Sequence, residues 1–162
     1  MDEENDLKEK IMIKEVMDKM SAIDFIKTLA VAEKGMRKTN FEKVKEFHKV
    51  FGILAKESPT IPEWSIARLR INLIDEEAGE VALAIAREEV TEIGKELADL
   101  AYVVYGAAIA YGIDFDRVFD EVHKSNMSKV NKDGSISRRE EDGKILKGDQ
   151  YLPPDLSFLK AV

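Results

Sequence analysis

The sequence predicts an all-α protein, and three observations lead to that fold class. The composition is 44% hydrophobic and 35% charged, which is typical of a folded, helix-rich chain rather than a disordered one. Residues 63–152 contain no proline, so long helices can form there. Apolar residues in that stretch recur at helical spacing, for example Ile66, Leu69 and Leu73. The 162 residues are enough for one compact domain with a buried core.

Two helices are predicted before the loop that contains Pro59 and Pro62. Residues 7–34 carry a loose apolar stripe and form an N-terminal helical arm, which packs either on its own domain or on a second subunit. Asn40 caps a short second helix that has its aromatic side chains on one face and is closed by Gly52.

Three helices and an irregular tail are predicted after this loop. Their N-caps are polar residues before each apolar run: Thr60 with Glu63 as a capping box, Thr91, and Asp114. The helices end near Arg87, Gly112 and Val130. Turn-forming Asp-Gly and Lys-Gly pairs mark the tail, which has room for one short hairpin around residues 136–146.

Two acidic pairs lie where helical spacing predicts buried apolar residues. With Ile66 at zero and about 100° per residue, Glu77 falls near ~20° and Glu80 near ~320°, within the stripe of Leu69 and Leu73. Glu96 and Asp99 repeat the i,i+3 spacing at the start of the next apolar helix. Buried carboxylates need a cation, so two facing pairs predict one metal site. Oxygen ligands without histidine or cysteine favour Mg²⁺, with Mn²⁺ possible, and an associated phosphate substrate.

Two other interpretations of these carboxylates stay open. A non-enzymatic helical scaffold would pair them in a buried ion-pair network, with Arg70 or Arg87 as the cation. A di-iron bundle would need Glu-x-x-His on two helices, and the nearest match is Asp120 with His123.

Composition also limits the partners. A net charge of −7 argues against binding to a nucleic-acid polymer. The absence of cysteine excludes disulfides and zinc–thiolate sites. The acidic N-terminus and the shortness of the apolar run 97–111 predict a cytoplasmic protein without a membrane span. Because that run is apolar on every side, we also expect a homodimer or homotetramer.

The chain resembles the all-α nucleoside triphosphate pyrophosphohydrolases, the superfamily of MazG and phosphoribosyl-ATP pyrophosphohydrolase. The resemblance rests on Glu-Glu-x-x-Glu at 76–80, Glu-x-x-Asp at 96–99, Ser-Asn-Met-Ser-Lys at 125–129 and the Asp-Gly-Lys segment at 142–148. It implies a four-helix-bundle-like, MazG-type fold with an extra N-terminal arm (1–38), a pyrophosphohydrolase domain (39–155) and a C-terminal tail (156–162). Taken together, these motifs look most like the phosphoribosyl-ATP-pyrophosphohydrolase-like branch of the superfamily. Hydrolysis of phosphoribosyl-ATP is therefore the alternative to hydrolysis of a nucleoside triphosphate.

The same resemblance implies a mechanism and a set of site residues. A Mg²⁺-activated water would attack the α-phosphorus of a nucleotide substrate and release pyrophosphate, as a housekeeping step for the nucleotide pool. The implied metal ligands are Glu77, Glu80, Glu96 and Asp99, and Glu76 or Glu77 would assist catalysis. The candidates for substrate binding are Arg70, Asn126, Lys129, Lys144 and Lys147. The candidates for an apolar base slot are Trp64, Phe47, His48 and Tyr102.

Overall fold

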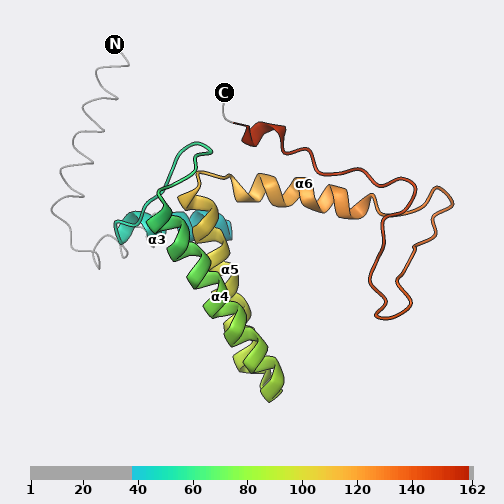
Figure 1. The fold of residues 1–162 in the computed structure, drawn as a ribbon, viewed down its shortest axis with the longest axis horizontal. Helices are drawn as coiled ribbons and strands as arrows, with labels where there is room; N and C mark the ends of the chain where they lie inside the picture. Colours follow the sequence, from blue (N-terminus) through green and yellow to red (C-terminus); the bar gives the residue numbers. More distant parts are fainter. Residues whose placement is uncertain (1–37, 161–162) are drawn as a thin grey trace, which may run out of the picture. The chain divides into compact units, whose positions relative to one another are not determined.

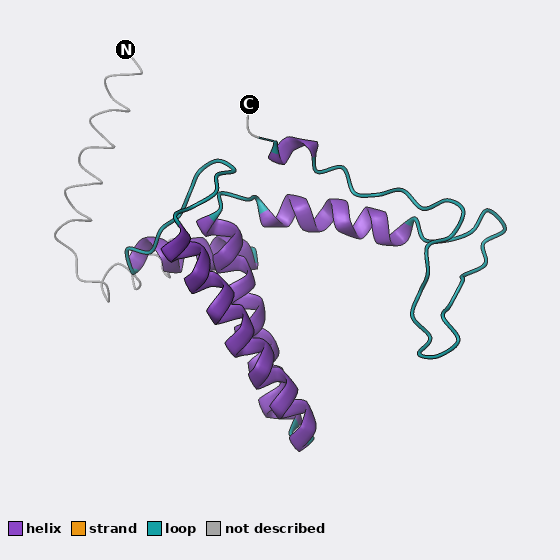
Figure 2. Cartoon of the chain, in the orientation of Figure 1, coloured by secondary structure: helices purple, strands orange, loops and turns teal. Residues whose placement is uncertain are grey.

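The computed structural model describes residues 38–160, and this part of the chain is all-helical (Figures 1 and 2). Its helices are α3 (Asn40–Val50), α4 (Trp64–Arg87), α5 (Val90–Ala110) and α6 (Phe115–Met127), followed by the short 3-10 helix η1 (Ser157–Leu159). The prediction of an all-α chain is therefore confirmed. The predicted N-terminal arm lies outside the described residues. Contacts divide the chain at Thr39, and the unit from Asn40 onward is considered by itself.

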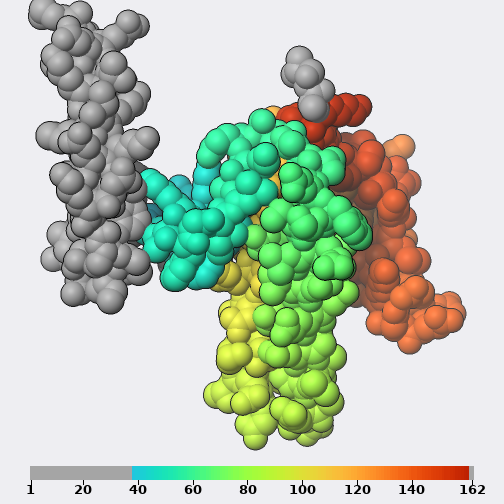
Figure 3. Space-filling model, turned by 60° about the vertical axis from the view of Figure 1, so that its left-hand side comes forward, coloured from blue at the N-terminus to red at the C-terminus, as the bar shows by residue number. Residues whose placement is uncertain are grey.

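Helices α4 and α5 form an antiparallel hairpin with a two-residue connection. They run side by side in both views (Figures 1 and 3). Glu88 ends α4 in the left-handed conformation, with φ 59° and ψ 25°, and its N–H donates to the carbonyl of Ile85. Ala67 and Ala84 of α4 and Ala108 of α5 are buried, and small side chains of this kind allow helices to approach closely.

Two of the predicted helix starts are wrong. Thr60 does not cap α4, because its hydroxyl donates to the carbonyl of Ser58 and its N–H to the carbonyl of Tyr111. The N-cap of α4 is Glu63, which makes no side-chain capping bond, and α5 likewise begins at Val90 after an uncapped Glu89. Thr60 is thus held by the loop and by Tyr111 instead of capping α4, and neither helix has a side-chain cap.

The other predicted boundaries agree more closely with the structure. Asp114 accepts a hydrogen bond from the Arg117 N–H and caps α6. Gly112 follows α5 with φ +68°, a conformation that suits glycine. α6 ends at Met127, before the predicted Val130.

Helix α3 packs on α5 and supplies much of the core. Val44 and His48 of α3 and Ile109 of α5 are the largest fully buried side chains of the described residues. Phe47 meets Tyr102 edge to face, with ring centroids 5.5 Å apart. These contacts fix α3 across the half of α5 that lies away from the α4–α5 turn.

The tail is attached to the C-terminal end of α6. Ser125 and Ser128 donate hydrogen bonds to the carbonyl of Leu152, and the Leu152 N–H donates to Ser128 Oγ at 2.8 Å. The predicted hairpin is present in minimal form, as one antiparallel bridge between Arg138 and Ile145. The serines of the 125–129 motif therefore hold the tail.

Candidate metal centre

The two acidic pairs meet across the α4–α5 hairpin. Glu77 of α4 and Glu96 and Asp99 of α5 each offer a carboxylate oxygen, and the three atoms lie within 4.8 Å of one another. The side chain of Glu96 is only 10% exposed, while Asp99 is 45% exposed. The site is thus anchored at the helix interface and open on one side.

Glu80 joins this group through Glu96. Its hydrogen bond with Glu96 and the repulsion between these two carboxylates raise the pKa of Glu80, with a smaller contribution from Glu77. Two carboxyl groups so close together favour sharing one proton or one cation. Glu76, the other predicted catalytic residue, is exposed on α4 and is not part of the cluster.

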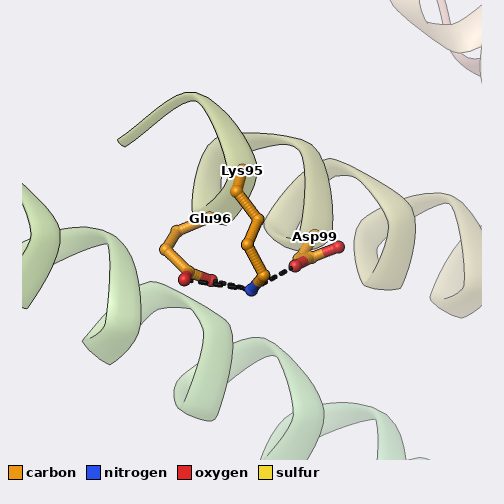
Figure 4. A network of polar contacts seen from close by, with 3 residues as sticks. All are labelled: Lys95, Glu96 and Asp99. Carbon is orange, nitrogen blue, oxygen red and sulfur yellow. Dashed lines mark hydrogen bonds and ion pairs between the residues drawn. The ribbon is translucent and has the colours of Figure 1, made fainter. Parts of the chain in front are cut away.

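A lysine that the sequence analysis did not single out is bound to this cluster. The Lys95 ammonium donates to both Glu96 carboxylate oxygens at 3.0 Å and to Asp99 Oδ2 at 2.9 Å (Figure 4). These carboxylates raise the pKa of Lys95. The four-residue spacing of Lys95 and Asp99 is the signal that could have identified it. The cation of the ion-pair network is therefore Lys95, rather than Arg70 or Arg87.

The donor set suits a hard divalent cation. Every candidate ligand is a carboxylate oxygen, and neither histidine nor cysteine belongs to the cluster among residues 38–160. Such a set could hold a metal ion, and its all-oxygen character is typical of Mg²⁺ or Mn²⁺ sites. The partial exposure of Asp99 leaves one side accessible to ligands that are not part of the protein.

A second polar group lies two helical turns away, inside the protein. Arg70 is 7% exposed, its Nε has no hydrogen-bond partner, and no ion pair joins it to a carboxylate of the described residues. His48 is 2% exposed and its Nδ1 bonds to the carbonyl of Leu54 at 2.9 Å. Burial, and to a smaller extent the Arg70 charge, lower the pKa of His48. Gly106 provides the space, because a Cβ there would lie 3.2 Å from His48 Nε2 and 3.3 Å from Arg70 Nη1.

The four candidates for the apolar base slot do not lie together in the structure. Phe47 and His48 of α3 lie on the α3–α5 interface, and Phe47 contacts Tyr102, one turn along α5 from Asp99. Trp64 is 70% exposed at the start of α4. Tyr102 is therefore the aromatic candidate nearest in register to the carboxylates.

The four predicted substrate-binding residues after α5 are not joined to the carboxylates. Asn126 is exposed at the end of α6, and Lys144 and Lys147 are exposed in the tail. Within residues 38–160, no hydrogen bond or ion pair links these side chains, or that of Lys129, to the acidic cluster. Lys147 instead lies over the Tyr151 ring at 4.2 Å.

No single helix of residues 38–160 is long and apolar enough to cross a bilayer. α5 and α6 reach the required length and composition only as a pair bent by 112°.

Comparison with known proteins identifies relatives of the chain. An uncharacterized protein, L479 of Acanthamoeba polyphaga mimivirus, is 33% identical over 103 residues, which cover 59% of this chain and 38% of that protein. A crystal structure of a proposed NTP pyrophosphohydrolase from Exiguobacterium sp. 255-15 covers 76% of this chain and 93% of its own, with 24% identity and a TM-score of 0.39. Residues 44–126, about half of the chain, match the phosphoribosyl-ATP pyrophosphohydrolase family. The chain therefore belongs to the phosphoribosyl-ATP pyrophosphohydrolase family.

Proposed function

We propose that the protein is a Mg²⁺-dependent nucleotide pyrophosphohydrolase, which hydrolyses a nucleotide at its α-phosphate to a monophosphate and pyrophosphate. The observation that carries the proposal is the convergence of Glu77, Glu96 and Asp99 within 4.8 Å across the hairpin. Membership of a pyrophosphohydrolase family supports the same reaction class.

The carboxylates divide into metal ligands and one candidate base. Glu77, Glu80, Glu96 and Asp99 would hold the metal, with buried Glu96 fixing its position between the helices. When bound, a divalent ion neutralises phosphate charge and lowers the pKa of a water. Glu76 faces solvent beside the cluster, so its carboxylate is available to orient or deprotonate that water.

The base and sugar of the substrate are proposed to lie along α5, on the side of the carboxylates away from the α4–α5 turn. Tyr102, which is 39% exposed and packed against Phe47, offers an aromatic surface for a base one turn from Asp99. Arg70 lies farther along and has donor capacity that the described protein leaves unused, so we assign it to an oxygen acceptor of the substrate. A pyrimidine deoxynucleotide such as dUTP or dCTP is our first choice of substrate, and phosphoribosyl-ATP is the alternative.

The test is a substrate panel that contains canonical, deoxy and modified nucleoside triphosphates together with phosphoribosyl-ATP. Pyrophosphate release is measured with Mg²⁺, with Mn²⁺ and with EDTA. We expect metal-dependent turnover of at least one member, and the preferred member identifies the base and sugar. If no member is turned over with either metal and Glu77→Ala behaves like the parent protein, the scaffold interpretation replaces the enzyme.

The open apolar surface of the hairpin is proposed to be covered by a second copy of the chain. Leu83 of α4 is 57% exposed, Ile85 is 54% exposed on the opposite side of the same helix, and Leu97 of α5 is 50% exposed. Exposed apolar side chains on two sides of the hairpin are costly to leave in water, and they lie on the two helices that carry the site. Lys144 and Lys147 of the tail, Asn126 of α6 and Lys129 just after it would then contact phosphates bound at the site of a neighbouring protomer.

The proposed assembly leads to a direct prediction. We expect a homodimer or homotetramer by light scattering at micromolar protein concentration, because the exposed leucine and isoleucine side chains would be buried between copies. Leu83→Glu should lower the mass toward that of a monomer, whereas Glu92→Lys, also exposed but polar, should leave it unchanged. A monomeric parent protein would contradict the proposal.

A further inference from the structure

Lys95 binds the oxygens that the proposed metal would need. Its three contacts, two to Glu96 and one to Asp99, match the three N–H donors of an ammonium group. Both partners belong to the cluster with Glu77. No other lysine or arginine among residues 38–160 forms an ion pair with these carboxylates.

An ammonium and a divalent ion cannot share these oxygens without strong repulsion. A Mg²⁺ ion lies about 2.0–2.1 Å from its ligand oxygens, so it would bring its two positive charges close to the Lys95 Nζ. Lys95 can leave, since its side chain is 63% exposed and its stem is flexible. Glu96 cannot move as freely, because its side chain is 10% exposed between the helices.

We propose that Lys95 is an internal counter-ion of the carboxylate cluster, which a divalent metal must displace in order to bind. This inference rests on the proposed metal site. The lysine offsets the repulsion among Glu77, Glu80, Glu96 and Asp99 and keeps them in one arrangement. It also lowers the affinity for metal, since its hydrogen bonds must break first.

The test compares two substitutions that remove the same charge at different places. Lys95→Met keeps most of the side-chain stem and removes the ammonium from the cluster. Lys124→Met is the matched control, because Lys124 is 69% exposed on α6 and is paired only with Glu121 among the described carboxylates. Mn²⁺ binding is measured by electron paramagnetic resonance without nucleotide, so the result does not depend on turnover.

We expect Lys95→Met to bind Mn²⁺ about fivefold more tightly than the parent protein, the size of effect that one nearby charge has in water. Lys124→Met should bind like the parent. In EDTA, Lys95→Met should also melt at a lower temperature than Lys124→Met, and Mn²⁺ should remove that difference. Equal affinities for the two variants would overturn the inference and leave the proposed function standing. A parent protein that binds no Mn²⁺ would overturn both.

Discussion

Glu96→Gln is expected to abolish pyrophosphate release while the protein stays folded. Glu96 is the most buried member of the cluster, it interacts with Glu80 and Lys95, and its ligand oxygen lies within 4.8 Å of those of Glu77 and Asp99. An amide keeps its volume but loses the negative charge that attracts a cation. Loss of metal stabilisation worth several kcal/mol corresponds to a rate lower by about a thousandfold or more.

The melting temperature of this variant in EDTA shows whether lost activity comes from lost metal binding or from unfolding. If Glu96 serves a metal, removing its charge relieves repulsion within the cluster, so the melting temperature in EDTA should stay equal or rise. Glu92→Gln is the control, since Glu92 is exposed one turn earlier on α5 and is not part of the cluster. Near-parental activity in Glu96→Gln, measured at saturating Mg²⁺, would exclude the proposed centre.

Gly112→Ala is expected to be the most damaging small substitution in the described chain. A Cβ at Gly112 would lie 2.0 Å from the carbonyl oxygen of Ser58, and the glycine has φ +68°. The clash is with the backbone of Ser58, which cannot rotate away as a side chain can. The same loop is tied to the end of α5, because the Thr60 N–H donates a hydrogen bond to the Tyr111 carbonyl. Because neither side can move without breaking this junction, we expect a loss of about 3 kcal/mol or more, from strain and overpacking together.

Gly52→Ala is a control that isolates the backbone contribution. Gly52 has a similar φ of +64°, but a Cβ there would meet nothing within 4 Å. Its cost should be limited to the left-handed conformation, about 1–2 kcal/mol. Urea denaturation of both variants measures the difference. Equal destabilisation would mean that the Ser58 contact relaxes and that only the φ angle matters.

The carboxylate site could be predicted because its signal is local and periodic. Glu77, Glu80, Glu96 and Asp99 each interrupt an apolar pattern, and a helical wheel is enough to place each pair on one face. The antiparallel hairpin then brings the pairs together. Lys95 was missed because a long side chain reaches beyond its own wheel position.

The starts of the helices and the surroundings of Arg70 could not be predicted, because they depend on contacts between residues far apart in the sequence. Thr60 has the sequence of a capping box, yet its backbone is held by Tyr111, which lies far along the chain. The sequence offers Arg70 as a partner for the carboxylates, but Arg70 is buried next to Gly106 of α5. Only the packing of α3 and α4 against α5 shows this.

The two-residue connection, Glu88 and Glu89, determines which residues of α4 and α5 lie opposite each other, and so where the two acidic motifs meet. Glu80 precedes the turn by nearly the same number of residues as Glu96 follows it, so the two side chains meet at one level of the hairpin. One inserted residue in either helix between motif and turn would rotate its carboxylates by about 100° and shift them by about 1.5 Å. Lengthening both helices by two whole turns would preserve the meeting point. In a hairpin with this turn, the interval between the two motifs can therefore grow only by nearly whole turns added to both helices, if the carboxylates are to stay together.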